Sequence, residues 1–161
     1  NLTGLENLDY FSRLAGFRYS DAQLQEFLEK AGLPSDSFGR RVGTYSKGMR
    51  QKTGIAIATA KQAKALFLDE PTSGLDSSSA LSLFKLLKEL AAGGLTVVAV
   101  VHQPRMEVFA ATDDLIVLGC GGCLFYCGPS VTRHSFLLSL TQPMLTKSSG
   151  GYKPLAISSW I

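Results

Sequence analysis

The sequence predicts an α/β fold in which a helical part precedes a mainly parallel sheet with helices and a terminal β-hairpin. Two helix-start patterns stand near the beginning of the chain. Two continuous apolar runs, at residues 65–68 and 95–101, enclose a segment of helical periodicity, which is the pattern of a strand–helix–strand unit. A glycine pair, Gly121 and Gly122, then separates two further apolar runs, as in a hairpin.

The composition agrees with one modest globular domain. The chain has 161 residues, of which 45% are hydrophobic and 18% are charged. Its formal charge of +3, from 16 basic and 13 acidic residues, is too small to indicate a nucleic-acid partner. No apolar run approaches the roughly 20 residues that span a bilayer, and the polar start lacks the basic region of a signal peptide.

The first two helices are predicted by capping boxes, in which side chains satisfy the free amides of a helix start. Thr3 and Glu6 form the first box, and Ser20 and Gln23 form the second. Apolar residues follow each box at helical spacing: Leu5, Leu8, Phe11 and Ala15 in the first helix, and Leu24, Phe27 and Leu28 in the second.

A third helix is predicted over about residues 48–62, after a connecting loop at residues 35–44. The stretch YSKGMRQK, at residues 45–52, carries three basic residues, a serine and a glycine. It is consistent with a basic patch for nucleic acid, with a solvated helix start, or with a helix terminus that holds a phosphate. Motifs later in the chain are needed to choose among the three.

The apolar runs at residues 65–68 and 95–101 are continuous rather than alternating, so we expect strands that are buried on both faces of a parallel sheet. Asp76 or Ser77 can cap the helix between them, and a glycine pair ends it. Four leucines are expected to face inward from that helix: Leu83, Leu86, Leu87 and Leu90.

Three cysteines, Cys120, Cys123 and Cys127, surround the predicted hairpin turn with the spacing CxxCxxxC. A zinc site would need a fourth ligand, and His134 is the nearby candidate. The glycine turn favours the simpler interpretation, a hairpin without metal. The odd number of cysteines and the lack of an export signal favour reduced thiols, as in cytosolic proteins. Beyond the hairpin, residues 131–161 show no clear period and predict a loosely ordered tail or linker.

Residues that can carry chemistry follow both apolar runs. Asp69 and Glu70 stand after the first run, within LFLDEPTSGLD, and His102 follows the second, within VVHQP. The carboxyl ends of neighbouring parallel strands form the edge where ligands bind in open α/β sheets. An acidic turn is the alternative for the carboxylate pair alone, but an imidazole at the same edge favours a ligand site.

These segments resemble, in order, those of the nucleotide-binding domain of ABC ATPases. YSKGMRQK resembles the signature segment, LFLDEP the Walker B segment, SGLD the D-loop and VVHQP the switch-histidine loop. The resemblance covers roughly residues 2–128 and implies a P-loop NTPase-like fold. No GxxxxGK[ST] occurs in the chain, so the resemblance is to the later portion of the domain, without the P-loop.

The resemblance implies ATP and Mg²⁺ as ligands and a role for each matching residue. Asp69 would belong to the Mg²⁺ shell, because a hard cation prefers oxygen ligands. Glu70 would polarise the attacking water, and His102 would contact the γ-phosphate. Asp76 would organise the contact with a second ATPase domain at the nucleotide.

The signature segment would face the γ-phosphate of ATP bound to the opposing domain of a head-to-tail dimer, because a helix N-terminus presents free amides to phosphate. The residues implied in this contact are Tyr45, Ser46, Lys47, Gly48 and Met49. Three of them depart from the family pattern: Tyr45 replaces a leucine, Lys47 a glycine and Met49 a glutamine. No aromatic platform accompanies the basic residues, which argues against nucleic acid.

The implied organisation is a partial ATPase domain at residues 1–130, with a helical subdomain over about residues 1–62 and half of the catalytic core over residues 63–130. The missing P-loop predicts a fragment that is inactive alone, whereas the intact domain is an ATPase. The implied function is to power transmembrane transport from the cytoplasmic face of a membrane, with a transmembrane domain or subunit as partner.

Two alternatives stay open: an ABC ATPase without a membrane partner, and a non-catalytic interaction piece. The cargo is open as well. Residues 102–129 are similar to eukaryotic half-transporters of lipids, sterols and pigments, whereas residues 2–16 and 45–52 are more similar to bacterial export ATPases.

Overall fold

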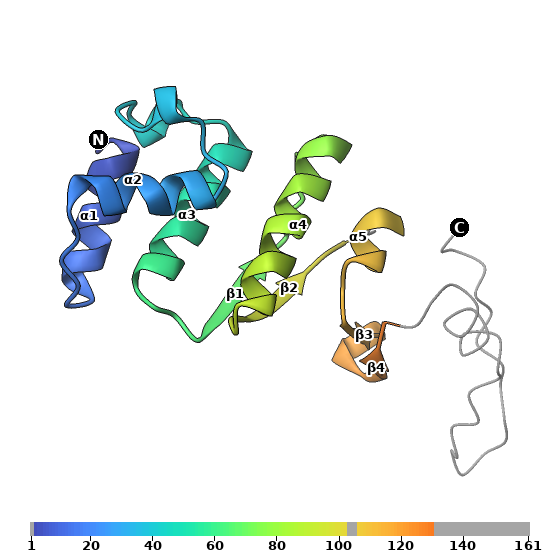
Figure 1. Cartoon of the computed structure of the whole chain (residues 1–161). Helices are drawn as coiled ribbons and strands as arrows, with labels where there is room; N and C mark the ends of the chain where they lie inside the picture. Colours follow the sequence, from blue (N-terminus) through green and yellow to red (C-terminus); the bar gives the residue numbers. More distant parts are fainter. Residues whose placement is uncertain (1, 103–105, 131–161) are drawn as a thin grey trace, which may run out of the picture. The chain divides into compact units, whose positions relative to one another are not determined.

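The computed structural model describes residues 2–102 and 106–130 (Figure 1). The chain divides into two compact units, residues 1–111 and residues 112–161. Within the described ranges, no helix combines the length and the apolar character that a membrane span requires.

Three helices make up the first part of unit 1, and each of them packs against the other two (Figure 1). They coincide with the three helices that the sequence predicts. Their bounds are Gly4–Leu14 for α1, Asp21–Lys30 for α2 and Lys47–Ala60 for α3.

Both predicted capping boxes are confirmed. The amide of Thr3 donates to Glu6 Oε2 at 2.8 Å, and the amide of Glu6 donates to Thr3 Oγ1 at 3.2 Å. Ser20 and Gln23 make the equivalent pair of hydrogen bonds at the start of α2. Because each box joins residues only three positions apart, the local sequence is sufficient to specify it.

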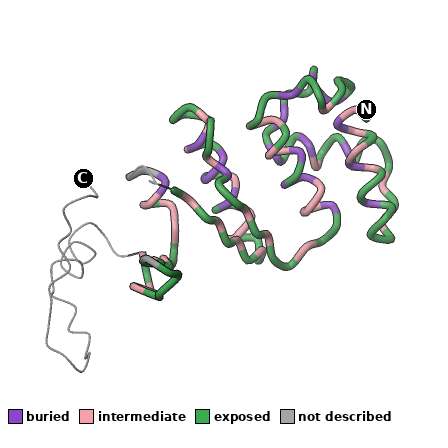
Figure 2. Tube along the Cα trace, turned by 180° about the vertical axis from the view of Figure 1, so that it is seen from behind, coloured by how far each residue is buried: buried purple, intermediate pink, exposed green. Residues whose placement is uncertain are grey.

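The predicted loop between α2 and α3 contains two short 3₁₀ helices, η1 at Ser35–Ser37 and η2 at Val42–Thr44. An isolated bridge between Thr3 and Arg41 holds this segment beside the start of α1. The segment and the three helices enclose one apolar core (Figure 2). Its buried residues are Leu8, Leu24, Leu28, Ala31, Leu33, Phe38, Tyr45, Ala56 and Ala60.

The predicted strand–helix–strand unit is also confirmed. β1 and β2 pair in parallel, with Asp69 opposite Val100 at their carboxyl ends, and α4 connects them. Of the two N-caps that the sequence allows, Asp76 is the one observed, and Gly93 of the predicted glycine pair is the C-cap. The bounds are Ala65–Asp69 for β1, Ser77–Ala92 for α4, Thr96–Val100 for β2 and Met106–Ala110 for α5.

A second core lies between α3, α4 and the sheet. Ile55 from α3 and Leu83 and Leu87 from α4 are buried in it. Leu86 and Leu90, which were expected to face inward, are only partly buried. The partly buried side chains that complete this core from the sheet are Leu66, Leu68 and Val97.

The prediction that both strands are buried on both faces is wrong in the described structure. Along β1 and β2, exposed residues alternate with partly buried ones (Figure 2). Phe67 is 75% exposed, and Val98 and Val100 are 40% and 52% exposed. Only one face of this two-stranded sheet packs into the second core; no other described element covers the opposite face.

Unit 2 contains the predicted hairpin. β3 spans Asp114–Leu118, β4 spans Leu124–Pro129, and the two strands pair in antiparallel fashion around η3 at Cys120–Gly122. Gly121 and Gly122 have φ values of 72° and 76°, a conformation that glycine adopts without steric cost. The predicted tail at residues 131–161, with His134, lies outside the described residues.

Candidate functional site

Two of the predicted site residues lie in direct contact. Nε2 of His102 is 3.2 Å from Oε1 of Glu70. Glu70 directly follows β1 and His102 follows β2, so the parallel pairing of the strands brings both to one edge of the sheet. The side chains of His102 and Glu70 are 75% and 47% exposed, which leaves the pair accessible to a ligand.

The backbone at Glu70 adopts an unusual conformation. Its φ of 45° lies in the left-handed region, which costs a non-glycine residue on the order of 1 kcal/mol. Hydrogen bonds on both sides hold it there: the Glu70 amide donates to the Val100 carbonyl at 2.9 Å, and the Ser73 amide donates to the Glu70 carbonyl at 3.1 Å. Such strain tends to occur at functional sites, so it is an independent reason to consider Glu70 functional.

Asp69 is the last residue of β1 and is exposed. Its carboxylate makes no hydrogen bond or ion pair with another described residue, and no group of three acidic, histidine or cysteine side chains gathers into a metal site within the described ranges. Mg²⁺ is commonly held by one or two carboxylates together with substrate phosphates and waters. Asp69 therefore fits Mg²⁺ as one oxygen ligand among several.

The Asp76 carboxylate caps α4. It accepts hydrogen bonds from the amides of Ser78 and Ser79, at 3.0 Å and 3.1 Å, and from the Ser78 hydroxyl. The hydrogen bonds from the side chains of Ser78 and Ser79, followed by those from their amides, hold the pKa of the Asp76 carboxyl well below its ordinary value. The carboxylate is thus ionised and already engaged, and its role at a dimer contact stays a prediction.

The N-terminus of α3 has the geometry of an anion site. Ser46 is the N-cap, and its Oγ accepts a hydrogen bond from the Met49 amide at 3.2 Å. The amides of Lys47 and Gly48 have no partner within the helix, because the first turn of an α-helix leaves its amides free. These amides and the positive end of the helix dipole favour an anion, although the phosphate contact itself stays a prediction.

Two of the predicted nucleotide-binding side chains point into the protein instead. Tyr45 is 3% exposed, its hydroxyl donates to the Ser37 carbonyl at 2.6 Å, and burial raises the pKa of the phenol. Met49 is partly buried and packs against the same core. The sequence placed both residues in the signature segment but gave no sign of their direction, which is set by contacts with α1 and η1.

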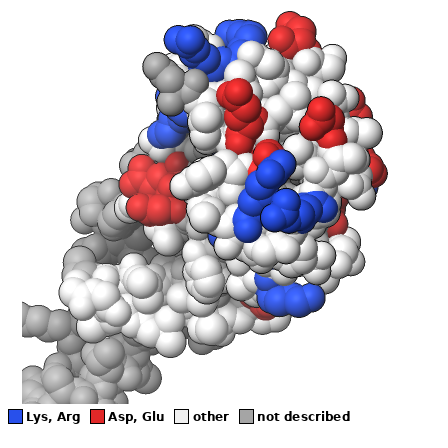
Figure 3. All heavy atoms as spheres, turned by 90° about the vertical axis from the view of Figure 1, so that its left-hand side faces the viewer, with Lys and Arg blue, Asp and Glu red and all other residues white. Residues whose placement is uncertain are grey.

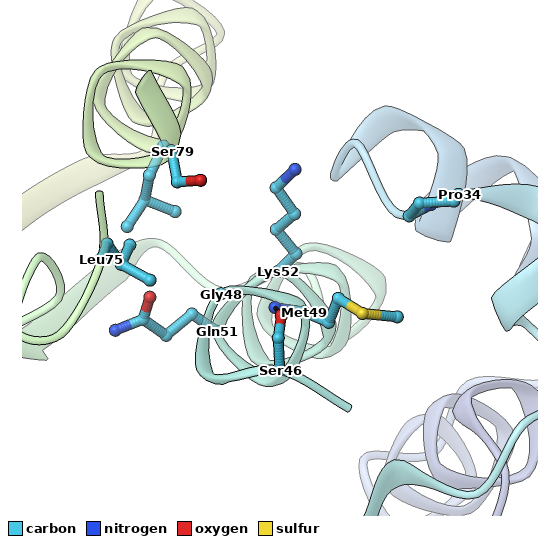
Figure 4. Close-up of a pocket in the computed structure, with 9 residues that line it drawn as sticks. Pro34, Ser46, Gly48, Met49, Gln51, Lys52, Leu75 and Ser79 are labelled. Carbon is cyan, nitrogen blue, oxygen red and sulfur yellow. Dashed lines mark hydrogen bonds between the residues drawn. The ribbon is translucent and has the colours of Figure 1, made fainter. Parts of the chain in front are cut away.

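A groove of about 200 Å³ lies beside the start of α3 (Figure 4). Gln51 extends from α3 towards Leu75 on the opposite wall, and Lys52 extends from the same helix. Lys52 Nζ donates to the Gly32 carbonyl at 2.9 Å and so ties α3 to the end of α2. Gln51 and Lys52 were not predicted as site residues, although they lie three and four positions after Gly48 and therefore on its helical face.

Acidic and basic side chains are interspersed on the face that Figure 3 shows. Two ion pairs join residues one helical turn apart, Arg13 with Asp9 at 2.8 Å and Lys30 with Glu26 at 2.7 Å. Exposed pairs of this kind contribute little to stability. They are typical of a solvated helix surface.

Comparison with curated proteins identifies ABC transporters as relatives. A family profile described as ABC transporter matches residues 1–73. ABC-type transporter claG of Penicillium crustosum is 36% identical over 146 residues, which cover 84% of this chain. ABC transporter G family member 2 of Dictyostelium discoideum is 40% identical over 113 residues, which cover 70% of it. The chain spans 20% of the first relative and 8% of the second.

Solved structures of ATP-binding cassettes share the fold. A dimeric post-hydrolysis state of an ATP-binding cassette bound to ADP and Pi has a TM-score of 0.68 and 27% identity, covering 81% of this chain and 58% of that chain. The ADP conformation of an ATP-binding cassette of an ABC transporter has a TM-score of 0.67 and 24% identity, covering 80% and 55%. The second likeness concerns the fold alone. On the combined evidence of profile, relatives and fold, the chain belongs to the ABC transporter ATP-binding domain family.

Proposed function

We propose that this chain is part of an ATP-binding and ATP-hydrolysing subunit that powers transmembrane transport. The observation that carries the proposal is the 3.2 Å approach of His102 to Glu70 at the carboxyl ends of two parallel strands. Glu70 accepts a proton from the attacking water, and His102 contacts the γ-phosphate. Phosphoryl transfer needs mainly positioning and charge neutralisation, which dispersed side chains of this kind can supply.

The ligands follow from the same residues. Asp69 supplies one oxygen to Mg²⁺, an ion that, when bound, neutralises charge on the transferring phosphate. The amides of Lys47 and Gly48, with the Ser46 hydroxyl, face the γ-phosphate of ATP on a second ATPase domain. A structural relative that is dimeric and bound to ADP and Pi supports the nucleotide and a second ATPase domain as partner. The head-to-tail arrangement of the two domains is part of the proposal.

Three further residues support the site indirectly in this proposal: Tyr45, Met49 and Asp76. Tyr45 and Met49 anchor the signature segment in the core, and Asp76 fixes the start of α4 directly after the SGLD loop. We assign residues 1–130 to the ATPase domain, with the helical subdomain at about 1–62. The working place is the cytoplasmic face of a membrane, beside a transmembrane domain or subunit, because the curated relatives are transporters.

ATP hydrolysis by the full-length protein that contains this chain tests the proposal. Glu70→Gln keeps the shape of the side chain but cannot accept a proton from water, so turnover should fall by about 100-fold or more. Glu89→Gln, which changes an exposed glutamate on α4, is the matched control and should hydrolyse ATP at the wild-type rate. Equal rates of ATP hydrolysis in Glu70→Gln and the wild type would show that Glu70 is not the base, and the proposed mechanism would then be wrong.

A further inference from the structure

The start of α3 packs against the loop that follows β1 in the same chain. The side chain of Lys47 lies over Gly74, where an added Cβ would be 3.6 Å from Lys47 Cδ and 3.9 Å from its Nζ. One position on, a Cβ added to Gly48 would be 3.4 Å from Leu75 Cδ2. A side chain larger than hydrogen at either glycine would therefore meet the other segment, so the signature segment and the SGLD loop lie side by side.

The same loop is hydrogen-bonded to the residue proposed as the base. The Ser73 amide donates to the Glu70 carbonyl at 3.1 Å, and the Leu75 amide donates to the Thr72 carbonyl at 3.1 Å. Gly74 has a φ of 71°, which completes a tight turn between them. Because the Ser73 amide is bonded to the Glu70 carbonyl, a displacement of this turn would also move the Glu70 backbone and, with it, the direction of the carboxylate.

Of the two Lys47 atoms that lie near Gly74, the aliphatic Cδ is the nearer and Nζ lies slightly further away. Lys47 is exposed, and within the described ranges its ammonium forms no ion pair with an acidic side chain. A lysine commonly lays its methylene groups along a surface and keeps its charge in water. The stem lies beside Gly74, which is itself exposed.

We propose that Lys47 is a positioning residue for hydrolysis, whose stem braces the turn at residues 73–75 and thereby fixes the direction of Glu70. This inference rests on the proposed function, in which Glu70 is the base. The backbone amide of Lys47 keeps its separate place at the phosphate. A glycine at this position, as in the family pattern, has no stem, so the bracing is a property of this chain.

The stem and the charge can be separated by substitution. Lys47→Ala removes both, whereas Lys47→Met restores an unbranched stem without the charge. In the full-length protein, Lys47→Ala should lower kcat about fivefold with KM for ATP unchanged, because only the orientation of the base is disturbed. Lys47→Met should recover the lost kcat to within about twofold of the wild type.

Lys61→Ala is the matched control, because Lys61 is an exposed lysine at the other end of α3, and it should leave both constants unchanged. Thermal melting of each variant checks that it is folded. A Lys47→Met protein as slow as Lys47→Ala would assign the effect to the charge and overturn the inference. So would a raised KM at wild-type kcat, which is the signature of a nucleotide contact.

Different results would overturn this inference alone and the proposed function as a whole. Lys47→Ala at the wild-type rate, in a protein whose hydrolysis is abolished by Glu70→Gln, overturns the bracing role alone. A wild-type protein that hydrolyses no ATP overturns both.

Discussion

The imidazole of His102 lies 3.2 Å from the carboxylate of Glu70, although a turn, a helix and a strand separate the two residues in the sequence. The contact is produced by the parallel register of β1 and β2, which sets Asp69 opposite Val100 and lets the Glu70 amide bond to the Val100 carbonyl. The pairing of the two strands therefore brings the proposed catalytic residues together: Glu70 directly follows β1, and His102 stands two positions after the end of β2.

Removing the imidazole should slow ATP turnover. His102→Ala loses the contact with Glu70 and the proposed contact with the γ-phosphate, so kcat of the full-length protein should fall. His102→Gln keeps a hydrogen-bonding group near the same place and should fall less. Steady-state kinetics of the two variants check this prediction. A His102→Ala protein with the wild-type kcat would show that the imidazole has no role in hydrolysis.

Tyr45 should matter for stability rather than for nucleotide affinity. Tyr45→Phe deletes the hydroxyl that donates to the Ser37 carbonyl, so the free energy of unfolding should fall by about 1 kcal/mol. KM for ATP should not change. Tyr10→Phe, at a residue that is 52% exposed, is the control and should change neither quantity. Urea unfolding and steady-state kinetics of Tyr45→Phe measure the two quantities. A raised KM for ATP without a loss of stability would show that Tyr45 contacts the nucleotide.

Because Asp76 caps α4 as a carboxylate, the free energy of unfolding should fall when that carboxylate is protonated at acid pH. Hydrogen bonds hold the pKa of Asp76 below its ordinary value, so the ionised form stabilises the fold above the pKa of the unfolded chain, about 3.9. That contribution is lost as the pH falls through the lower folded-state pKa. Asp76→Asn should therefore be less stable than the wild type at pH 7, with a difference that shrinks below about pH 4. A difference that is constant from neutral to acid pH would contradict the assignment.

The hairpin cysteines should hold no metal. Cys123 and Cys127 are free and exposed, and a thiol reagent should modify both in the folded protein. Mass spectrometry under native conditions should show no stoichiometric zinc. A chelator that released zinc and unfolded the hairpin would establish a structural metal site in its place.

Local hydrogen bonds made much of this fold predictable. The capping boxes at Thr3 and Ser20 and the cap at Asp76 join residues two or three positions apart, so the sequence contains both partners. The parallel strands follow from two apolar runs that enclose a helical segment, and the hairpin follows from two apolar runs on either side of Gly121 and Gly122. The family motifs then placed the candidate residues on these elements.

Contacts between distant segments were not predictable in the same way. The burial of Tyr45 depends on Ser37 and on the close approach of Gly4. The contact of Lys47 with Gly74 depends on how α3 lies against the turn after β1. The exposure of Phe67 on β1 could not be predicted either. A continuous apolar run shows that both faces of a strand are suited to burial, but it does not show whether another element covers each face.

The most direct test of the account is the identity of the nucleotide that Glu70→Gln retains. The full-length variant is incubated with MgATP, separated from free nucleotide, and its bound nucleotide is identified by chromatography. Because the amide cannot accept a proton from water but leaves the phosphate contacts intact, the account predicts that ATP is retained and that ADP forms at about 1% of the wild-type rate or less. ADP formed at the wild-type rate would contradict the assignment of Glu70 as the base.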